Sequence, residues 1–367
     1  MNYFPKYDGN VHPDEWINNI KKYYNIWENN YGGFLNTAKS LINPIIKLPA
    51  EINDLEKLRD ILKKDITFTL FKNVNKRKLQ SLKYIPERDG GDNLKFFSCF
   101  HNLCYNTETN DIEEQKEYFL KALNDHPYFF TEFYKGMNNI NSMDELIKAF
   151  DEIVMDESNM IIDGSIVALK HVATGKYLTS IDDLHYTTGS EGPIVYTGNS
   201  KFDPNACWYI FGNNGKYNDY IYTKSDVSFQ HKISGTSLGI CSYSQQVRYS
   251  RQQVRYSRHL SRTQYEYHKS PSSNHTEVNC NGNESEWKID YSRLENYEGY
   301  LKSNDIVNLS IKKSCDINGP IQDGQVEFLR SHDIQFTIGN DTFQEVVCHN
   351  ERLGENDEWC IELIKQV

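Results

Sequence analysis

Two histidines stand before the same short turn in the second half of the chain. His171 opens the run His-Val-Ala-Thr-Gly, and His231 opens the run His-Lys-Ile-Ser-Gly. Histidine changes its charge near neutral pH, so it suits proton transfer or contact with a polar ligand. A ring that recurs before the same turn also suits a structural role, in which it holds the turn by hydrogen bonding to the backbone. We expect the structural role, because a repeated fold must form the same turn more than once.

Motifs of established enzyme chemistry are absent from the sequence. It contains no Gly-x-x-x-x-Gly-Lys-Ser/Thr phosphate loop, no Gly-x-Ser-x-Gly elbow and no His-Glu-x-x-His. Cys99, His101 and Cys104 have a spacing that superficially suits a metal. However, the apolar residues around them follow one helical face, which favours a helix of the core. We therefore expect no enzymatic activity, no metal and no cofactor.

The histidines belong to a longer repeated pattern. Segments 167–178 and 227–238 share the form Val-x-(Leu/Phe)-x-His-x-x-(Ser/Thr)-Gly-x-x-Leu. Each copy later reaches a Trp-x-Ile segment, and a third unit ends in the same way; these segments begin at Trp208, Trp287 and Trp359. Repeats of this kind indicate an architecture built from similar units.

Each unit has the pattern of short strands joined by a turn. Apolar residues alternate in Val-x-Leu and in Trp-x-Ile, which places them on one face of a strand. Glycine after Ser or Thr accepts the positive φ that a tight turn needs. Three units that are too small to form cores alone predict a β-trefoil. Its structural repeat residues are His171, Gly175, Leu178, Trp208, His231, Gly235, Leu238, Trp287, Leu329 and Trp359.

The same residues resemble a known family. His-x-x-Thr-Gly-Lys-Tyr-Leu-x-Ser, the second histidine run, Leu-Arg-Ser-His-Asp and the paired Glu-Val-x-Cys segments at 277–280 and 345–348 look like a MIR domain. This is the β-trefoil module of protein O-mannosyltransferases and of inositol trisphosphate and ryanodine receptors. The resemblance covers about residues 160–365. It implies a ligand-binding or regulatory module that is not itself a catalyst.

Polar and aromatic residues after the second strand of a unit are the candidate ligand contacts. They are assigned to equivalent loop positions at the strands that carry Leu178 and Leu329, and their types suit the faces and polar edges of sugars. The candidates are Tyr177, Asp182, His185, Tyr186, His332 and Asp333.

The middle unit carries a basic, aromatic insertion near 243–269. Gln-Gln-Val-Arg-Tyr-Ser-Arg occurs at 245–251 and again at 252–258. Arginine and tyrosine together could bind nucleic acid or another anionic polymer by phosphate contact and stacking. We favour a recently duplicated surface loop without a selected role, because identical copies leave little time for selection.

Residues 1–155 follow the helical period instead. Apolar residues recur every three to four positions over several segments, which predicts an all-α domain of five to seven short helices. One of these helices should begin at Asp54 and align Leu58, Leu62 and Ile66. We expect this domain at 1–155, a linker at 156–163 and the trefoil at 164–365, so that the fold class is α + β with two domains.

The start of the chain also resembles the start of retroelement Gag capsid regions. Phe4-Pro-Lys, Trp16-Ile, Ile20 and Tyr23 carry this likeness. It implies a capsid-like helical domain, although the zinc knuckle and protease motif of a Gag polyprotein are absent. An unrelated helical adaptor domain remains the alternative.

Charge and composition narrow the class of protein further. The net charge is −11, which opposes general binding of nucleic acid outside the insertion. No apolar run is long enough to span a membrane, and no signal peptide is evident, so we expect a cytoplasmic protein. We expect a non-enzymatic protein whose trefoil recognises a carbohydrate or a protein segment. The alternative is a structural protein that self-assembles through its helical domain into a homo-oligomer.

Overall fold

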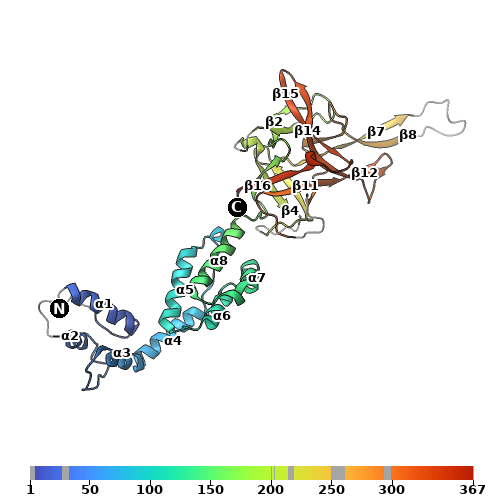
Figure 1. Cartoon of the computed structure of the whole chain (residues 1–367). Helices are drawn as coiled ribbons and strands as arrows, with labels where there is room; N and C mark the ends of the chain where they lie inside the picture. The colour runs from blue at the N-terminus through green and yellow to red at the C-terminus, as the bar shows by residue number, and fades with distance from the viewer. Residues whose placement is uncertain are drawn as a thin grey trace. The chain divides into compact units, whose positions relative to one another are not determined.

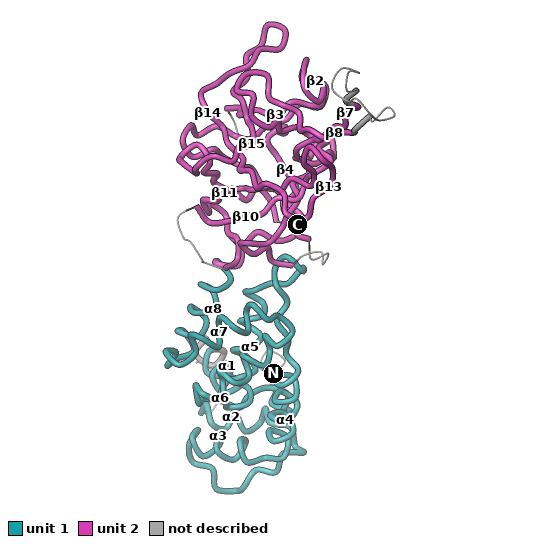
Figure 2. The backbone as a smooth tube through the Cα atoms, turned by 90° about the vertical axis from the view of Figure 1, so that its right-hand side faces the viewer, with its two compact units in different colours: residues 1–155 teal, residues 156–367 magenta. Residues whose placement is uncertain are grey.

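The computed structural model describes residues 5–26, 33–199, 201, 203–213, 219–248, 261–292 and 299–366. The chain divides into two compact units, Met1–Met155 and Asp156–Val367, which Figure 2 shows in different colours. We call them the helical unit and the trefoil unit.

The described part of the helical unit contains eight α-helices and two short 3-10 helices (Figure 1). The α-helices are α1 (Pro13–Ile26), α2 (Phe34–Ser40), α3 (Leu55–Lys64), α4 (Ile66–Gln80), α5 (Asn93–Thr107), α6 (Ile112–Ala122), α7 (Pro127–Gly136) and α8 (Met143–Ser158). The 3-10 helices are η1 (Glu87–Asp89) and η2 (Met137–Asn139). The all-α class is confirmed, with more helices than the five to seven expected.

One additional helix arises where a longer one was expected. The predicted helix starts with Asp54 as its N-cap and buries Leu58 and Leu62, but it ends at Lys64. Asp65 then accepts a hydrogen bond from the backbone N–H of Thr67 and caps a new helix. The expectation that Ile66 continues the apolar stripe is therefore wrong, and its side chain is 66% exposed.

The described part of the helical unit contains an aliphatic-rich core and an aromatic core. Trp16 and Ile20 are buried with Leu58 and Leu62 in the first core. Aromatic rings dominate the second, in which Phe119 and Phe150 lie 5.0 Å apart between their centroids. Phe4 and the side chain of Tyr23, which also carry the Gag-like resemblance, lie outside the described residues. Among the described residues, no helix combines the length and the apolar character needed to cross a membrane.

The trefoil unit is built from β-strands. Those of its main, twelve-stranded sheet are β1 (Ile166–His171), β2 (Tyr177–His185), β3 (Pro193–Gly198), β4 (Trp208–Gly212), β5 (Asp226–His231), β6 (Leu238–Ile240), β9 (Thr276–Cys280), β10 (Trp287–Tyr291), β11 (Asp305–Lys312), β14 (Val326–Ile338), β15 (Asp341–His349) and β16 (Trp359–Lys365). Two separate hairpins pair β7 (Ser242–Arg248) with β8 (Ser261–Tyr267) and β12 (Cys315–Asp316) with β13 (Gly319–Pro320). The short 3-10 helices are η3 (Pro204–Ala206) and η4 (Glu355–Asp357).

Three repeats of four strands make up the main sheet. They consist of β1–β4, then β5, β6, β9 and β10, and finally β11 and β14–β16. In each repeat the tryptophan opens the last strand and pairs with the valine of the first: Val167 with Trp208, Val227 with Trp287 and Val307 with Trp359. The chain therefore has the threefold strand plan of a β-trefoil, as the sequence predicted.

The tryptophans also hold the second strand of their own repeats. Each fully buried indole donates its Nε1–H to a backbone carbonyl, at 3.0 Å from Trp208 to Leu178, 2.9 Å from Trp287 to Leu238 and 3.1 Å from Trp359 to Leu329. A buried carbonyl needs such a partner, so the indole both fills the core and satisfies the strand.

The segment expected as a linker, 156–163, belongs to folded structure instead. Helix α8 continues to Ser158, and Ile161 and Ile162 are fully buried. Ile161 donates its backbone N–H to the carbonyl oxygen of Leu301, at 2.8 Å. The expectation of a linker over 156–163 is wrong, because Ile161 belongs to the trefoil core.

The insertion of the second repeat forms a two-stranded arm. Strands β7 and β8 pair over seven residues each and project from the trefoil in Figure 1. Most of the duplicated segment, residues 249–258, lies outside the described residues, so the prediction for its role is untested.

Candidate functional site

The repeated histidines lie inside the turns that they precede. The Nδ1 atom of His171 lies 2.9 Å from the hydroxyl of Thr174, and its Nε2 atom lies 3.0 Å from the carbonyl oxygen of Asn356. In the second repeat, His231 lies 3.0 Å from Ser234 Oγ and 3.2 Å from the carbonyl oxygen of Asn205. Both rings are fully buried, and burial lowers the pKa of each. Neutral, enclosed rings of this kind hold turns and offer no free edge to a ligand.

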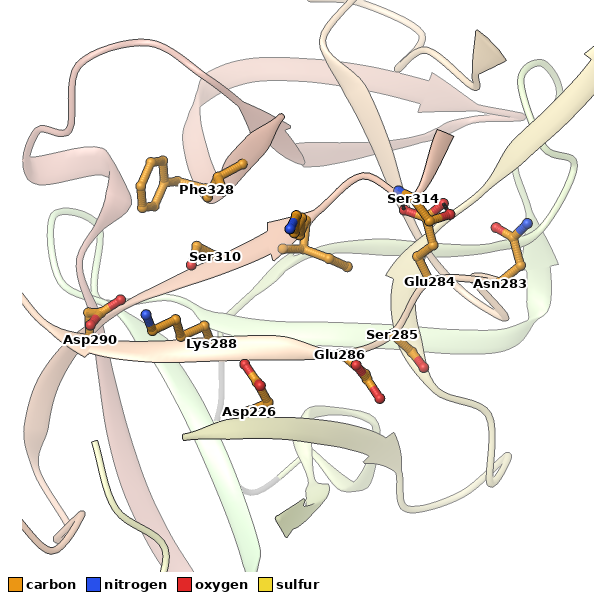
Figure 3. A pocket seen from close by; sticks show the side chains of 13 residues that line it. Asp226, Asn283, Glu284, Ser285, Glu286, Lys288, Asp290, Ser310, Ser314 and Phe328 are labelled. Atoms are coloured by element: carbon orange, nitrogen blue, oxygen red, sulfur yellow. Dashed lines mark hydrogen bonds between the residues drawn. The ribbon is translucent and has the colours of Figure 1, made fainter. Parts of the chain in front are cut away.

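A row of side chains crosses four strands on the outer surface of the trefoil. The strand register pairs Lys288 with Asp226 on one side and with Ser310 on the other, and it pairs Ser310 with Phe328. We call Asp226, Lys288, Ser310 and Phe328 the open row. Its members come from β5, β10, β11 and β14 and lie side by side because their strands are neighbours in the sheet (Figure 3).

Strand alternation explains why the open row faces outward. Trp287 and Ile289 point into the core, so Lys288 between them must point to the opposite face. The next residue on that face is Asp290, and the residue before Trp287 is Glu286. A single core motif, Trp-x-Ile, thus presents alternate charged residues to the surface.

The threefold plan repeats this row twice more. The first equivalent row consists of Ile166, Tyr209, Gln230 and Ser237. This row contains no charged residue. Ser237 stands in it where the open row has Phe328. The second equivalent row, which we call the filled row, consists of Ile306, Cys360, Lys170 and Tyr177.

The chain itself covers the filled row. Tyr177 is buried against Ala168 and Ala206, and its hydroxyl lies 3.2 Å from both carboxylate oxygens of Glu362. Burial and the Glu362 charge raise the pKa of Tyr177 to about 12. Lys201 pairs with the same carboxylate at 3.3 Å. Tyr177 is only 7% exposed, so almost none of its surface remains for a ligand.

The open row lines a cavity of about 720 Å³, which we call the Phe328 cavity. Its other walls come from the segment between β9 and β10 and from the end of β11. Besides the open row, its lining residues are Asn283, Glu284, Ser285, Glu286, Asp290, Ile311, Lys312, Ser314 and Val326. The volume lies within the range of small-ligand pockets.

Several charged side chains that line this cavity make no polar contact with the rest of the described chain. Among the described residues, the side chains of Asp226, Glu286, Lys288 and Asp290 have no hydrogen-bond or ion-pair partner within the chain. Glu284 differs, because it accepts hydrogen bonds from Ser314 and Tyr267 and forms part of the wall. The cavity therefore combines a fixed wall, an aromatic face and polar groups that a ligand can bind.

The aromatic candidates from the sequence are structural in this fold. Tyr177 belongs to the filled row. Tyr186 is buried, and its hydroxyl lies 3.1 Å from the carbonyl oxygens of Val195 and Val278. Burial raises the pKa of Tyr186 far above the ordinary value. Both hydroxyls therefore bind the protein itself.

The remaining candidates lie on two strands, β2 and β14. His185 is exposed and contacts the carbonyl oxygen of Glu191 at 2.9 Å, while Asp182 and Asp333 are exposed. His332 lies 2.9 Å from the buried carboxylate of Glu345, which in turn accepts hydrogen bonds from the backbone N–H of Ser272. None of the six sequence candidates lines the Phe328 cavity.

Sequence reasoning missed the open row because it treated the Trp-x-Ile segments only as core. The signal was present in the middle residue, which is Tyr209, Lys288 or Cys360 in the three repeats. Only the second repeat places a charge there and follows it with another, at Asp290. The cross-strand partners, however, could not be read without the register.

Metal-binding geometry is not found in the described residues. No group of three or more His, Cys, Asp or Glu side chains there is arranged to hold an ion. In the run that resembles metal spacing, Cys104 is buried and Cys99 is exposed. Burial raises the pKa of Cys104 to about 12, which keeps its thiol protonated.

Comparison with known proteins identifies similar folds. No family model matches the chain, and no curated protein matches it. Among solved structures, the SDF2-like protein from Arabidopsis thaliana is 21% identical, with a TM-score of 0.39, and the match covers 56% of this chain and 99% of that one. A Caenorhabditis elegans protein of unknown function is 19% identical, with a TM-score of 0.39, over 56% of this chain and 98% of that one.

A third match is the protein O-mannosyltransferase Pmt1–Pmt2 complex of S. cerevisiae bound to the sugar donor. It is 18% identical, with a TM-score of 0.38, and covers 73% of this chain and 37% of that chain. These matches do not show the Gag-like resemblance of the first half. At these scores, the likeness concerns the fold only.

Proposed function

We propose that the chain is a non-enzymatic binding protein whose trefoil recognises a carbohydrate in the Phe328 cavity. The observation that carries this proposal is the open row itself. It places a partly exposed aromatic ring beside unpaired carboxylates and an amine, whereas the filled row uses the same positions for internal contacts.

The lining suits the chemistry of a sugar. A pyranose has apolar C–H faces and a rim of hydroxyl groups that both donate and accept hydrogen bonds. The ring of Phe328 offers a face for the apolar side. Asp226 and Asp290 accept from hydroxyls, and Lys288 donates to them. Few but well-placed polar groups around an apolar contact are typical of ligand sites.

A glycan array tests this proposal. The full chain would be compared with the double variant Phe328→Ala, Asp290→Asn on the same array. Saturable binding of the unmodified chain to one sugar class, lost in the double variant, is the expected result. If a folded chain bound no sugar on the array, the proposal would be overturned. Recognition of a protein segment would then be the favoured function.

A second function, self-association through the helical unit, has one observation in its favour. Ile66, Leu70 and Val74 recur every four residues on α4 and are 66%, 58% and 41% exposed. Such a spacing forms an apolar stripe on one face of a helix. Light scattering at rising concentration would detect oligomers, and Leu70→Glu should abolish them. A mass of 42.9 kDa at every concentration would exclude this function.

A further inference from the structure

We propose that the sugar bound in the Phe328 cavity is an amino sugar, whose protonated amine lies between the Asp290 carboxylate and the Phe328 ring. This inference rests on the proposed function and names the substrate class of the same site. It follows from comparing the open row with the filled row, position by position.

The filled row shows what the scaffold places over its aromatic ring. Lys170 Nζ lies 5.9 Å from the centroid of Tyr177 and 3.9 Å from Glu362. Lys201 supplies a second amine to the same carboxylate. An amine held by a carboxylate and an aromatic face is stabilised by both the ion pair and the cation–π contact.

The open row contains the matching carboxylate and ring. Glu362 follows Trp359 by three residues, and Asp290 follows Trp287 by three (362 − 359 and 290 − 287). The register confirms the equivalence, since Glu362 pairs with Ala168 and Asp290 pairs with Asn308 in the neighbouring first strands. Phe328 takes the place of Tyr177 in the same way.

The open row has no amine at the position of Lys170, and none from the position of Lys201 lines the cavity. Ser310 stands at the position of Lys170, so the space beside the ring is not filled by a long side chain. Arg352 precedes Trp359 by seven residues, as Lys201 precedes Trp208 (359 − 352 and 208 − 201). Arg352 is exposed, does not line the cavity and has no carboxylate partner among the described residues.

The charge of the cavity also favours a cation. Its lining contains four carboxylates, Asp226, Glu284, Glu286 and Asp290, against two amines. One amine, Lys312, pairs with Asp323 at 3.3 Å. The remaining amine, Lys288, has no carboxylate within 4.0 Å among the described residues. An excess of unpaired carboxylates attracts a positively charged ligand and repels an acidic one.

The neutral groups of the lining favour an amino sugar over a lysine side chain. Ser285 and Ser310 extend the polar surface away from Asp290. The hydroxyls of a sugar can bind these groups while its amine binds Asp290. A lysine side chain carries only the amine and would leave them without a ligand partner.

Titration calorimetry with matched oligosaccharides tests this inference. The probes are the tetramer of β-1,4-linked glucosamine and the tetramer of β-1,4-linked N-acetylglucosamine, which share a backbone and differ in the amine. Measurements use the full chain at a mildly acidic pH, so that the free amines are protonated. Loss of one charge-assisted hydrogen bond weakens binding roughly 10- to 100-fold.

We expect the glucosamine tetramer to bind at least about tenfold more tightly than the acetylated one. Asp290→Asn should weaken binding of the glucosamine tetramer much more than binding of the acetylated one, because only the former loses an ion pair. Asp341→Asn is the matched control, because Asp341 is exposed and lies outside the lining, so both affinities should stay as they are.

Two results would overturn the inference. The first would keep the proposed sugar site, and the second would replace the sugar with another ligand. Equal or tighter binding of the acetylated tetramer would exclude the amine but keep a sugar site. Binding of tetralysine as tightly as the glucosamine tetramer would exclude the amino sugar in favour of a basic peptide. A blank result with every saccharide on the array is the separate failure of the proposed function.

Discussion

Tyr177 and Phe328 occupy the same position in two repeats of the trefoil, yet one ring is buried and the other lines an open cavity. Tyr177 lies under Ala206 of the 3-10 helix η3. In the third repeat, η4 is fixed to β14 by another contact, the ion pair of Arg330 with Asp357 at 2.7 Å. The two repeats thus have the same strand arrangement at this position. They differ in the segment that covers the aromatic ring.

Removing the two rings should affect stability very differently. Tyr177→Ala deletes a buried side chain and should lower the free energy of unfolding by about 3–5 kcal/mol. Phe328→Ala removes a half-buried ring and should cost about 1 kcal/mol. Urea unfolding followed by circular dichroism gives both values. Equal losses would mean that the Phe328 ring is as well packed as that of Tyr177.

The three tryptophans should contribute equally, because each makes the same hydrogen bond. Replacing Trp208, Trp287 or Trp359 by Phe leaves a buried carbonyl without its donor and removes part of the core. We expect each variant to lose roughly 2–4 kcal/mol of stability. Calorimetric unfolding of the three single variants provides the measurement. A variant that unfolds like the unmodified chain would show that its indole does not hold the second strand.

The trefoil could be predicted because its core repeats locally along the chain. Val-x-Leu, the turn glycine and Trp-x-Ile each specify a face or a turn from neighbouring residues alone. The position of 156–163 could not be predicted, because Ile161 is buried in a core formed by distant residues; its backbone bonds to Ile221 and to Leu301, 140 residues later (301 − 161). The break between α3 and α4 was missed for a local reason: Asp65 is a good N-cap inside an otherwise helical pattern.

The candidate site was far less predictable than the fold. Its members come from four strands that are separated along the chain and adjacent only through pairing. Asp226 and Phe328, at the ends of the open row, are joined by three register contacts that no spacing reveals. Residue type alone favoured Tyr177 and Tyr186, and both are used inside the protein.

The turn glycines provide a test of the repeated turn. Gly175 has a φ of 70° and Gly235 a φ of 71°, in the left-handed region that other residues adopt at a cost. Gly175→Ala should therefore destabilise the trefoil by about 1 kcal/mol. An added methyl group would meet no atom closer than 3.9 Å, so backbone strain alone is measured.

Gly212→Ala is the matched control for this turn, since a methyl group there meets its nearest atom at 3.8 Å and the backbone angle is ordinary. Thermal unfolding should show a lower midpoint for Gly175→Ala than for Gly212→Ala. Equal midpoints would contradict the role assigned to the turn.

Acid should destabilise the trefoil through Asp357. Burial opposes ionisation of this carboxylate, but hydrogen bonds from His349 and Arg330 outweigh it and lower the pKa from 3.8 to about 2. A depressed pKa stabilises the fold above the unfolded value, near pH 4, and this stability is lost as the pH falls towards 2. The difference corresponds to about 2 kcal/mol.

Unfolding by urea at a series of acidic pH values measures this contribution. Asp357→Asn should be less stable at neutral pH, because it leaves Arg330 without its buried partner, and it should lose less stability on acidification. Asp323→Asn, at a fully exposed position, should behave like the unmodified chain. If Asp357→Asn and the unmodified chain lost the same free energy of unfolding on acidification, the effect would come from other carboxylates.

The central claim is that the open row, and not its filled counterpart, binds the ligand. Titration calorimetry of the full chain with the saccharide identified on the array tests it most directly, using Phe328→Ala and Tyr177→Phe. The second variant removes only the hydroxyl that binds Glu362 and keeps the buried ring. The account predicts at least about tenfold weaker binding for Phe328→Ala and unchanged binding for Tyr177→Phe. Weaker binding of Tyr177→Phe with full affinity in Phe328→Ala would contradict it.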